Sequence, residues 1–511
     1  MARFFKFKSV EDLAAESQRL GLDLRFSDDL TPLFRPVRIG PLCAGNSLCI
    51  QPMEGCDGTL DGRPGELTFR RYRRFGAGGA KLIWGEATAV LEEGRANPRQ
   101  LLIDEQTAPD LERTLRECRQ AHRDAFGDDS DLVVGLQLTH SGRYSYRRPL
   151  LAFHDSVLDP RTPLPADGLP VGRQTAGGDR ATGRTVDTTY PLLDDDYLRR
   201  LVDHYVAAAR LAHRIGFDFV DIKQCHRYLL SELLAAKTRP GPYGGSLENR
   251  TRLAREIITA LRTEVPDLVI ATRLNVFDCI PFRSGGEVVR WSGGSGEATP
   301  PNNHPTTQPP HHLNDGVPCP WAPPLLSAWG TREDDPFTPD LSEPRWWIGE
   351  MVRLGVALVN ISMGNPYATP HVIRPFEYPP PDGYETPEHP LVGVDRHFRL
   401  AAEMQSAYPS VPMVGSGYSY LQEFFAQAGA ANVRDSRITF VGVGRAALPQ
   451  PDFAQQLREN GRLDRKRVCR TFSYCTALMR AKHNELGQFA TGCPPFDKEV
   501  YGPIWDEARR P

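Results

Sequence analysis

The sequence has no long apolar run. No stretch approaches the roughly 18 consecutive apolar residues that a bilayer-spanning helix needs. The N-terminal stretch MARFFKFKSVEDLAAESQ has no apolar core before its first acidic residues, so it lacks the pattern of a secretory signal. We therefore expect a cytoplasmic protein whose 10 cysteines stay reduced.

An excess of charge of one sign is also missing. Lys and Arg number 61 and Asp and Glu 64, which gives a formal net charge of −3. Proteins that bind nucleic acid by neutralising phosphates carry a basic surplus that this composition lacks. We expect a small-molecule substrate and no nucleic-acid or membrane partner, and we leave open assembly into a homo-oligomer.

The chain does contain a series of strand-length apolar runs. Hydrophobic residues make up 40% of the 511 residues, which is enough for a large core. The runs are apolar on both faces and mostly β-branched, as are strands of a parallel sheet that is covered on both sides. They are Ser47–Met53, Lys81–Glu86, Leu132–Leu138, Phe217–Lys223, Leu268–Leu274, Ala357–Ser362, Val411–Gly415 and Ile438–Val443.

Helical patterns alternate with these runs. Asp194–Ile215 carries its apolar residues on one stripe and is followed by Gly216, a residue typical of helix ends. Ser246–Val265 begins at a serine suited to capping. Eight strands with intervening helices predict an α/β fold of the closed (β/α)8 TIM-barrel type. The alternative is an open doubly wound sheet, but no GxGxxG loop follows Met53.

Glycine and proline are in surplus, and the surplus is local. Each occurs 45 times, about 18% together against an average of about 12%. Much of it lies in Pro281–Pro344, which is either a disordered insert or a substrate lid. Tryptophans in and just after this segment favour a packed lid, whereas three histidines in low-complexity surroundings do not predict a metal site. These residues are Trp291, Trp321, Trp329, Trp346, Trp347, His304, His311 and His312.

We divide the chain into three parts. Residues 1–40 form an N-terminal leader with a short helix, in which Ser9 and Asp12 make a capping box. Residues 41–465 form the barrel, with 281–344 as its Pro/Gly-rich insertion and long loops on the catalytic face. Residues 466–511 form a C-terminal tail.

Candidate catalytic residues follow the fourth run. Lys223, His226 and Tyr228 stand within six residues, just past a strand end, where barrel enzymes have their active sites. Lys and His can donate hydrogen bonds to a developing oxyanion, and Tyr can deliver a proton. A surface turn with unrelated polar residues would have the same spacing, so spacing alone leaves both interpretations open.

The segment KQCHRY, which begins at Lys223, is followed by YGGSLENR at Tyr243–Arg250. These two segments resemble the signature of the old yellow enzyme family of flavin-dependent ene reductases, in which a His-x-x-(His/Asn)-x-Tyr segment precedes YGGSxxNR. NSLCIQPM, KLIWGEATAV, LQLTHSGR, ATRL, VGSG and VGVGRAAL resemble further family strands in the same order. The resemblance covers about Leu33 to Leu457, apart from the Pro-rich insertion.

The resemblance implies an FMN-binding barrel with NADPH or NADH as reductant, and no metal. Residues near the isoalloxazine would be Pro52, Met53, Glu54, Ala87, Gln137 at the pyrimidine edge, and Arg273 near N1 and O2. Residues at the phosphate would be Gly415, Ser416, Gly444 and Arg445, since backbone amides and a guanidinium suit a phosphate dianion. Tyr228 would donate the proton, and His226 with Lys223 would grip the substrate carbonyl.

Two positions depart from the family pattern. Lys223 replaces the first His of the substrate-binding pair, and its point charge could favour a carboxylate or phenolate substrate. Glu54 stands where the family has Thr or Cys, and its charge would disfavour the reduced anionic flavin unless it is protonated or paired. A Lys223–Glu54 pair would reconcile both departures; in the alternative, Lys223 pairs with Glu54 or Glu86 and is structural.

Other family-like residues receive structural roles. His140 and Arg143 match a family motif, but we expect them to orient a loop. Some relatives hold a four-iron cluster with four closely spaced cysteines, whereas the tail here offers Cys469, Cys475 and Cys493 without a Cys-x-x-Cys. We therefore expect one flavin and no cluster.

The sequence thus predicts an enzyme, an NAD(P)H:flavin oxidoreductase that reduces an activated C=C bond through flavin N5. One alternative is the same flavin barrel acting oxidatively, as a dehydrogenase, demethylase or desaturase. A second is a flavin-free lyase in which Lys223 forms a Schiff base. A third is a non-catalytic barrel that serves as a binding subunit.

Overall fold

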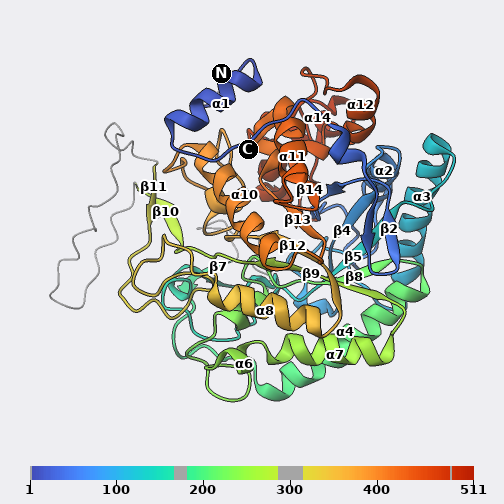
Figure 1. Cartoon of the computed structure of the whole chain (residues 1–511). Helices are drawn as coiled ribbons and strands as arrows, with labels where there is room; N and C mark the ends of the chain where they lie inside the picture. Colours follow the sequence, from blue (N-terminus) through green and yellow to red (C-terminus); the bar gives the residue numbers. More distant parts are fainter. Residues whose placement is uncertain (1–2, 166–180, 286–314, 484–485, 511) are drawn as a thin grey trace.

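The computed structural model describes residues 3–165, 181–285, 315–483 and 486–510, and at its centre is a closed barrel of eight parallel strands (Figure 1). Each strand pairs with the next barrel strand along the chain, and the last pairs with the first. The predicted (β/α)8 fold is confirmed, and each predicted run supplies one strand. The strands are β3 (Leu48–Ile50), β4 (Leu82–Ala89), β5 (Val133–Thr139), β8 (Phe219–Ile222), β9 (Val269–Asn275), β12 (Val356–Ser362), β13 (Met413–Gly415) and β14 (Phe440–Val443).

A short hairpin plugs the amino end of the barrel. Its strands, β1 (Val37–Ile39) and β2 (Leu42–Ala44), pair antiparallel. Ile39 and Ala44 are buried in one cluster with residues that begin the barrel strands, such as Leu82. Because this end is closed by apolar side chains, a polar site belongs at the carboxyl end of the strands.

Bulky side chains fill the barrel interior above the plug. The rings of Trp84 and Phe219 meet edge to face with centroids 5.0 Å apart, and both are buried. A Cβ atom on Gly135 would lie 2.1 Å from the Phe219 ring, so glycine at this position makes room for the ring. The barrel is therefore a packed core that supports a site at its upper end.

Helices cover the outside of the barrel (Figure 1). The predicted helix after residue 194 is confirmed: α4 (Asp195–Arg214) begins at Asp194, whose carboxylate accepts the Tyr197 amide at 2.6 Å. None of the helices in the described ranges is long and apolar enough to cross a membrane. The others of at least eight residues around the barrel are α2 (Glu66–Gly76), α3 (Ala108–Phe126), α7 (Arg252–Glu264), α8 (Ser342–Arg353), α10 (Pro390–Ala407), α11 (Phe425–Arg434) and α12 (Phe453–Asn460).

The helix predicted over Ser246–Val265 differs in one respect. Ser246 caps it as predicted and accepts the Asn249 amide at 3.3 Å, but the chain forms a short α6 (Leu247–Arg250) before α7. Thr251 separates the two helices, and its hydroxyl donates to the Leu247 carbonyl at 2.8 Å. A hydroxyl that hydrogen-bonds to a carbonyl of the preceding turn can bend or interrupt a helix. The spacing of hydrophobic residues does not reveal such a bond.

The N-terminal segment packs on the loops of the barrel. Helix α1 (Val10–Arg19) begins with the predicted capping box of Ser9 and Asp12. Ahead of it, the backbone amide of Phe5 donates to the Glu377 carboxylate at 2.7 Å.

The C-terminal segment is anchored near the end of β3. It contains α13 (Tyr474–Arg480), the paired β15 (Lys482–His483) and β16 (Gly487–Gln488), and α14 (Lys498–Ala508). The Thr491 amide donates to the Gly55 carbonyl at 2.6 Å. Asp497 forms ion pairs with Arg70 and Arg74 of α2 at 2.8 and 2.7 Å. These contacts bring α13 over the carboxyl end of the barrel.

Two long segments follow β5 and β9. Each contains a small antiparallel pair, β6 (Pro163–Pro165) with β7 (Ala181–Thr185), and β10 (Phe282–Ser284) with β11 (Gly316–Pro318). After β11 the Trp329 indole donates to the Asn275 carbonyl at 2.8 Å, so this flank of the insertion is packed on β9. Trp291, His304, His311 and His312 lie outside the described residues.

Candidate active site

One cavity at the carboxyl end of the barrel is lined by nearly all the site residues that the sequence analysis predicts. Twelve of the thirteen predicted site residues line it. The thirteenth, Gly415, ends β13 beside the cavity, where its carbonyl accepts the Gln51 carboxamide at 3.2 Å. Those in the lining are Pro52, Met53, Glu54, Ala87, Gln137, Lys223, His226, Tyr228, Arg273, Ser416, Gly444 and Arg445.

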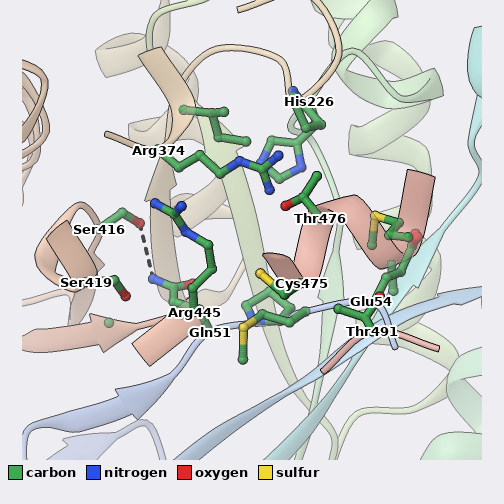
Figure 2. Close-up of a pocket in the computed structure, with 18 of the residues that line it drawn as sticks. Gln51, Glu54, His226, Arg374, Ser416, Ser419, Arg445, Cys475, Thr476 and Thr491 are labelled. Carbon is green, nitrogen blue, oxygen red and sulfur yellow. Dashed lines mark hydrogen bonds between the residues drawn. The ribbon is translucent and has the colours of Figure 1, made fainter. Parts of the chain in front are cut away.

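The turns that follow β13 and β14 form one side of the cavity. This side contains several hydroxyl groups, glycines and one guanidinium group. Figure 2 shows Ser416, Ser419 and Arg445 together on this side, with Ser416 bonded to Gln51. Arg445 donates through Nη2 to the Pro375 carbonyl at 2.6 Å, while its buried Nη1 has no partner among the described residues. Gly417 has a φ of 93°, a left-handed conformation that favours glycine.

Beneath the cavity, buried Asp221 organises the floor. Its carboxylate accepts the Gln137 carboxamide nitrogen at 2.5 Å, the Trp84 indole at 2.7 Å and the Arg273 amide at 2.7 Å. Burial raises the pKa of Asp221 to about 6, although these donors act in the opposite direction. Because the Gln137 nitrogen is engaged by Asp221, the amide oxygen of Gln137 is the group directed elsewhere.

The predicted catalytic segment leaves β8 in an unusual conformation. His226 and Arg227 both have positive φ, 67° and 61°, which costs energy in residues other than glycine. The buried Arg227 guanidinium offsets this cost by pairing with Asp155 and, at 3.2 Å, with Asp278. The long loops that carry these carboxylates therefore hold the segment in place.

His226 is neutral and surrounded by cations. Burial, and then the charges of Arg273, Lys223 and Arg374, lower the pKa of His226 well below its usual range. Its Nε2 lies 3.1 Å from the Ser362 hydroxyl, which can serve as donor or acceptor. A neutral imidazole keeps one N–H for hydrogen bonding to a ligand.

Lys223 lies against Tyr228. Its Nζ is 3.7 Å from the centroid of the Tyr228 ring, a cation–π contact. Burial lowers the pKa of Lys223, and the nearby charge of Glu54 acts in the opposite direction. Of the two partners considered for Lys223, Glu86 forms its ion pair with Arg71, whereas Glu54 is the carboxylate whose charge acts on the lysine.

Glu54, Tyr228 and Tyr367 form a chain of polar groups. The Tyr228 hydroxyl lies 3.4 Å from Glu54 Oε1 and 3.0 Å from the Tyr367 hydroxyl. Glu54 also accepts from Gln100 at 3.0 Å and from Asn97 at 3.3 Å. A phenol placed between a carboxylate and a second phenol can give up a proton and recover it.

Several lining residues were not predicted. Tyr367 and Arg374 come from the segment between β12 and α10, in which α9 is Pro370–Ile373. The C-terminal segment adds residues from α13 and beyond. No motif marks any of them, because they reach the cavity only through packing of loops far apart in sequence. Those from the C-terminal segment are Cys475, Thr476, Met479, Arg480 and Thr491.

His140 and Arg143 are not among the cavity-lining residues. His140 lies 2.9 Å from the Tyr197 hydroxyl of α4, and burial lowers its pKa to about 3. Arg143 pairs with Asp159 at 2.6 Å and Glu232 at 2.8 Å. Their partners join β5 to neighbouring segments, as expected of structural residues.

No group of three or more His, Cys, Asp or Glu side chains in the described ranges is arranged to hold a metal ion. Cys469, Cys475 and Cys493 all come from the C-terminal segment. Burial raises the pKa of Cys493, and the nearby Cys469 and Cys475 thiols contribute in the same direction. Burial likewise raises the pKa of Cys469, so Cys469 and Cys493 are poorly ionised thiols, which does not favour metal binding.

The residues present fit FMN, the cofactor implied by the sequence resemblance. The side with Ser416, Gly444 and Arg445 offers donors to a phosphate, including the unpartnered Nη1 of Arg445. Gln137 and Arg273 line the floor, and Arg273 Nε is buried without a partner in the described part of the chain. A bound anionic group would satisfy these two guanidinium atoms of Arg273 and Arg445.

Comparison with known proteins agrees with this assignment. A family model described as the NADH:flavin oxidoreductase / NADH oxidase family matches residues 32–287. An NADPH dehydrogenase of Geobacillus sp. (strain WCH70) is 30% identical over 255 residues, which cover 49% of this chain and 65% of that protein. An NADH:flavin oxidoreductase of Gibberella zeae is 29% identical over 261 residues, covering 49% and 58%. The matches thus span less than two thirds of these relatives.

Solved structures share the fold. The old yellow enzyme homologue from Zymomonas mobilis superposes with a TM-score of 0.53 at 20% identity, covering 86% of this chain and 96% of that one. A 2-naphthoyl-CoA reductase in complex with 2-naphthoyl-CoA gives a TM-score of 0.61 at 17% identity, covering 93% and 58%. At these identities the likeness establishes the barrel fold alone.

Proposed function

This chain belongs to the NADH:flavin oxidoreductase / NADH oxidase family, and we propose that it is an FMN-dependent enzyme that uses NADPH or NADH to reduce the activated C=C bond of an α,β-unsaturated carbonyl compound. The supporting observation is the convergence of twelve of the thirteen predicted site residues on one cavity. They come from seven different barrel strands or their loops, so chance placement of the whole set in one cavity is improbable.

When bound, FMN supplies the hydride chemistry, accepting two electrons from the nicotinamide and passing them to the alkene. The protein holds the cofactor and controls charge around it. Arg445 and Ser416 bind the phosphate, and Pro52, Met53 and Ala87 border the ring system. Gln137 directs its amide oxygen to the pyrimidine edge, and Arg273 places a fixed positive charge there.

Lys223 and His226 bind the activating carbonyl of the substrate. Both donate hydrogen bonds to its oxygen, which becomes more negative as the alkene accepts hydride at the β-carbon. Donors that are fixed before the reaction stabilise this developing charge without reorganisation. Burial of Lys223 at 5% exposure strengthens the effect, because little water competes for its ammonium group.

Tyr228 completes the reduction by giving its hydroxyl proton to the α-carbon. Lys223 over the ring stabilises the phenolate that remains. Tyr367, 3.0 Å away, relays a replacement proton to it. Glu54 accepts a hydrogen bond from Tyr228 in the resting state and so orients the phenol.

A second candidate is the same site acting in the oxidative direction, as a dehydrogenase or desaturase. The contact between Glu54 and Tyr228 favours it, because a carboxylate can accept the proton that Tyr228 removes from a substrate. In this case the substrate reduces the cofactor, and no nicotinamide is needed.

The test is the visible spectrum of the purified protein under anaerobic conditions. We expect a flavin spectrum that NADPH or NADH bleaches and that an enone such as 2-cyclohexenone restores. Bleaching by a saturated substrate without nicotinamide would favour the oxidative candidate. A colourless protein that takes up no FMN would refute both and leave a non-catalytic barrel or a lyase; borohydride trapping of a carbonyl compound on Lys223 would identify the lyase.

A further inference from the structure

The cavity contains more positive than negative side chains. Among the described residues that line it, five are cationic and one, Glu54, carries a carboxylate. Like charges gathered in a site withdrawn from water repel one another, unless a bound group compensates them. The cationic residues are Lys223, Arg273, Arg374, Arg445 and Arg480.

With the proposed cofactor bound, four of the five cations have a compensating group. Under the proposed function, Arg445 faces the cofactor phosphate and Arg273 faces the pyrimidine edge. Arg480 pairs with Asp382 at 3.0 Å and lies over the Tyr367 ring at 4.8 Å. Lys223 is within the electrostatic influence of Glu54.

Arg374 is the remaining cation. Its Nε and Nη2 are buried and have no hydrogen-bond partner in the described part of the chain. Burial, and then the charges of neighbours led by Arg445, lower the pKa of Arg374 to about 10, so it is still a cation at neutral pH. Asp382, the carboxylate whose charge acts on it, is the one paired with Arg480.

Other arginines of this chain bind carboxylates through the same edge, which consists of the Nε and Nη2 atoms. Arg19 donates through Nε and Nη2 to the two oxygens of Glu16, both at 2.7 Å. Arg332 binds Asp334 with the same two atoms at 2.9 and 2.6 Å. This edge presents two parallel N–H groups, which match the two oxygens of a carboxylate.

Arg374 also has a distinct place in the cavity. Figure 2 shows its side chain reaching toward His226, whereas Ser416 and Ser419 lie on the other side with Arg445. The charge of Arg374 contributes to the lowered pKa of His226, which supports their proximity. Arg374 therefore reaches the substrate end of the cavity, although the charge of Arg445 on the phosphate side also acts on it.

We propose that the substrate carries a carboxylate in addition to its activating carbonyl, and that the Nε and Nη2 edge of Arg374 binds this carboxylate. The inference rests on the proposed function and specifies its substrate class as anionic enones. The long side chain rotates to present its paired N–H groups, while Lys223 and His226 hold the carbonyl. Binding of the carboxylate satisfies the two Arg374 nitrogens that have no partner among the described residues.

The experiment compares acids with their methyl esters. The substrates are enones with a carboxylate attached through one to four methylene groups, each paired with its ester. For the best acid we expect kcat/KM at least tenfold above that of its ester. In Arg374→Gln we expect the acid-to-ester ratio of kcat/KM to fall about tenfold or more. In Arg374→Lys it falls less, because an ammonium group keeps the positive charge but lacks the two parallel N–H groups. Arg332→Gln is the matched control, since Arg332 uses the same edge but lies outside the cavity.

Two further measurements separate this inference from the proposed function. The FMN content of Arg374→Gln is expected to equal that of the wild type; loss of FMN would assign Arg374 to the phosphate and overturn the inference. Calorimetric binding of acid and ester needs no turnover, so it tests Arg374 even if the enzyme does not reduce enones. Equal binding of acid and ester by the wild-type protein, or an unchanged ratio in Arg374→Gln, would also overturn it.

Discussion

The two sides of the cavity are built differently. The phosphate side comes from the short turns that follow β13 and β14. Its residues are Ser416, Gly417, Gly444 and Arg445. The substrate side draws on the turn after β3, the strained segment after β8 and the loop between β12 and α10. Its residues are Glu54, Lys223, His226, Tyr228, Tyr367 and Arg374. The two departures from the family pattern, Glu54 and Lys223, both lie on the substrate side, beside the family-like His226 and Tyr228. Under the proposed function, the departures therefore concern substrate recognition rather than the binding of the cofactor phosphate.

The substrate side is expected to give the largest effect on turnover. His226→Ala removes one donor to the developing oxyanion, which lowers the rate by roughly 10²- to 10³-fold. The check is stopped-flow reoxidation of the reduced enzyme by an enone. The variant is expected to retain FMN, so a loss of flavin would place His226 on the cofactor side and break the contrast between the two sides.

The phosphate side is expected to give the largest effect on cofactor affinity. Arg445→Leu removes a buried charged donor, a change of roughly 2–5 kcal/mol in related cases, equivalent to a loss of at least about 30-fold in FMN affinity. Fluorescence titration of the apoprotein with FMN measures it. Arg462→Leu, which replaces an exposed arginine outside the cavity, is the control. Unchanged FMN affinity in Arg445→Leu would contradict the assignment.

The dependence of kcat/KM on pH tests whether Lys223 acts as a cation on the substrate side. Burial lowers its pKa, so its ammonium loses a proton at a lower pH than an ordinary lysine does. We expect kcat/KM for enone reduction to fall as pH rises through this lowered pKa. In Lys223→Arg the guanidinium stays protonated, and the alkaline fall moves to higher pH. An identical alkaline limb in both proteins would show that another group titrates.

The smallest effect concerns Asp221 below the cavity floor. Asp221→Asn removes a buried negative charge near Arg273 and Gln137, so the flavin potential is expected to rise, by roughly 30 mV or about 1.4 kcal/mol for two electrons. The pKa of Asp221 is about 6, so the carboxylate is charged at pH 8 and increasingly protonated below pH 6. The difference in potential between variant and wild type should therefore shrink at pH 5. A constant difference would show that charge is not the cause.

Much of this site could be predicted because it follows strand ends. Lys223, Arg273 and Gly444 lie at or just after apolar runs that the sequence marks clearly. Tyr367, Arg374 and Arg480 could not be found in this way, since their loops and the C-terminal segment have no periodic pattern or motif. The break at Thr251 was missed for a similar reason, because a single hydroxyl bonding to the backbone decides it.

The sequence by itself determined the barrel, its eight strands and most of the cofactor side. Alternation of apolar runs with amphipathic helices is a local property, and burial on both faces leaves few other folds for it. Only the tertiary structure decided which polar groups meet: it places Glu54 beside Tyr228 and Asp221 beneath Gln137, and it leaves Nε and Nη2 of Arg374 without a partner in the described ranges. These relations join residues up to hundreds of positions apart, so they arise from packing and electrostatics in three dimensions rather than from any pattern along the chain.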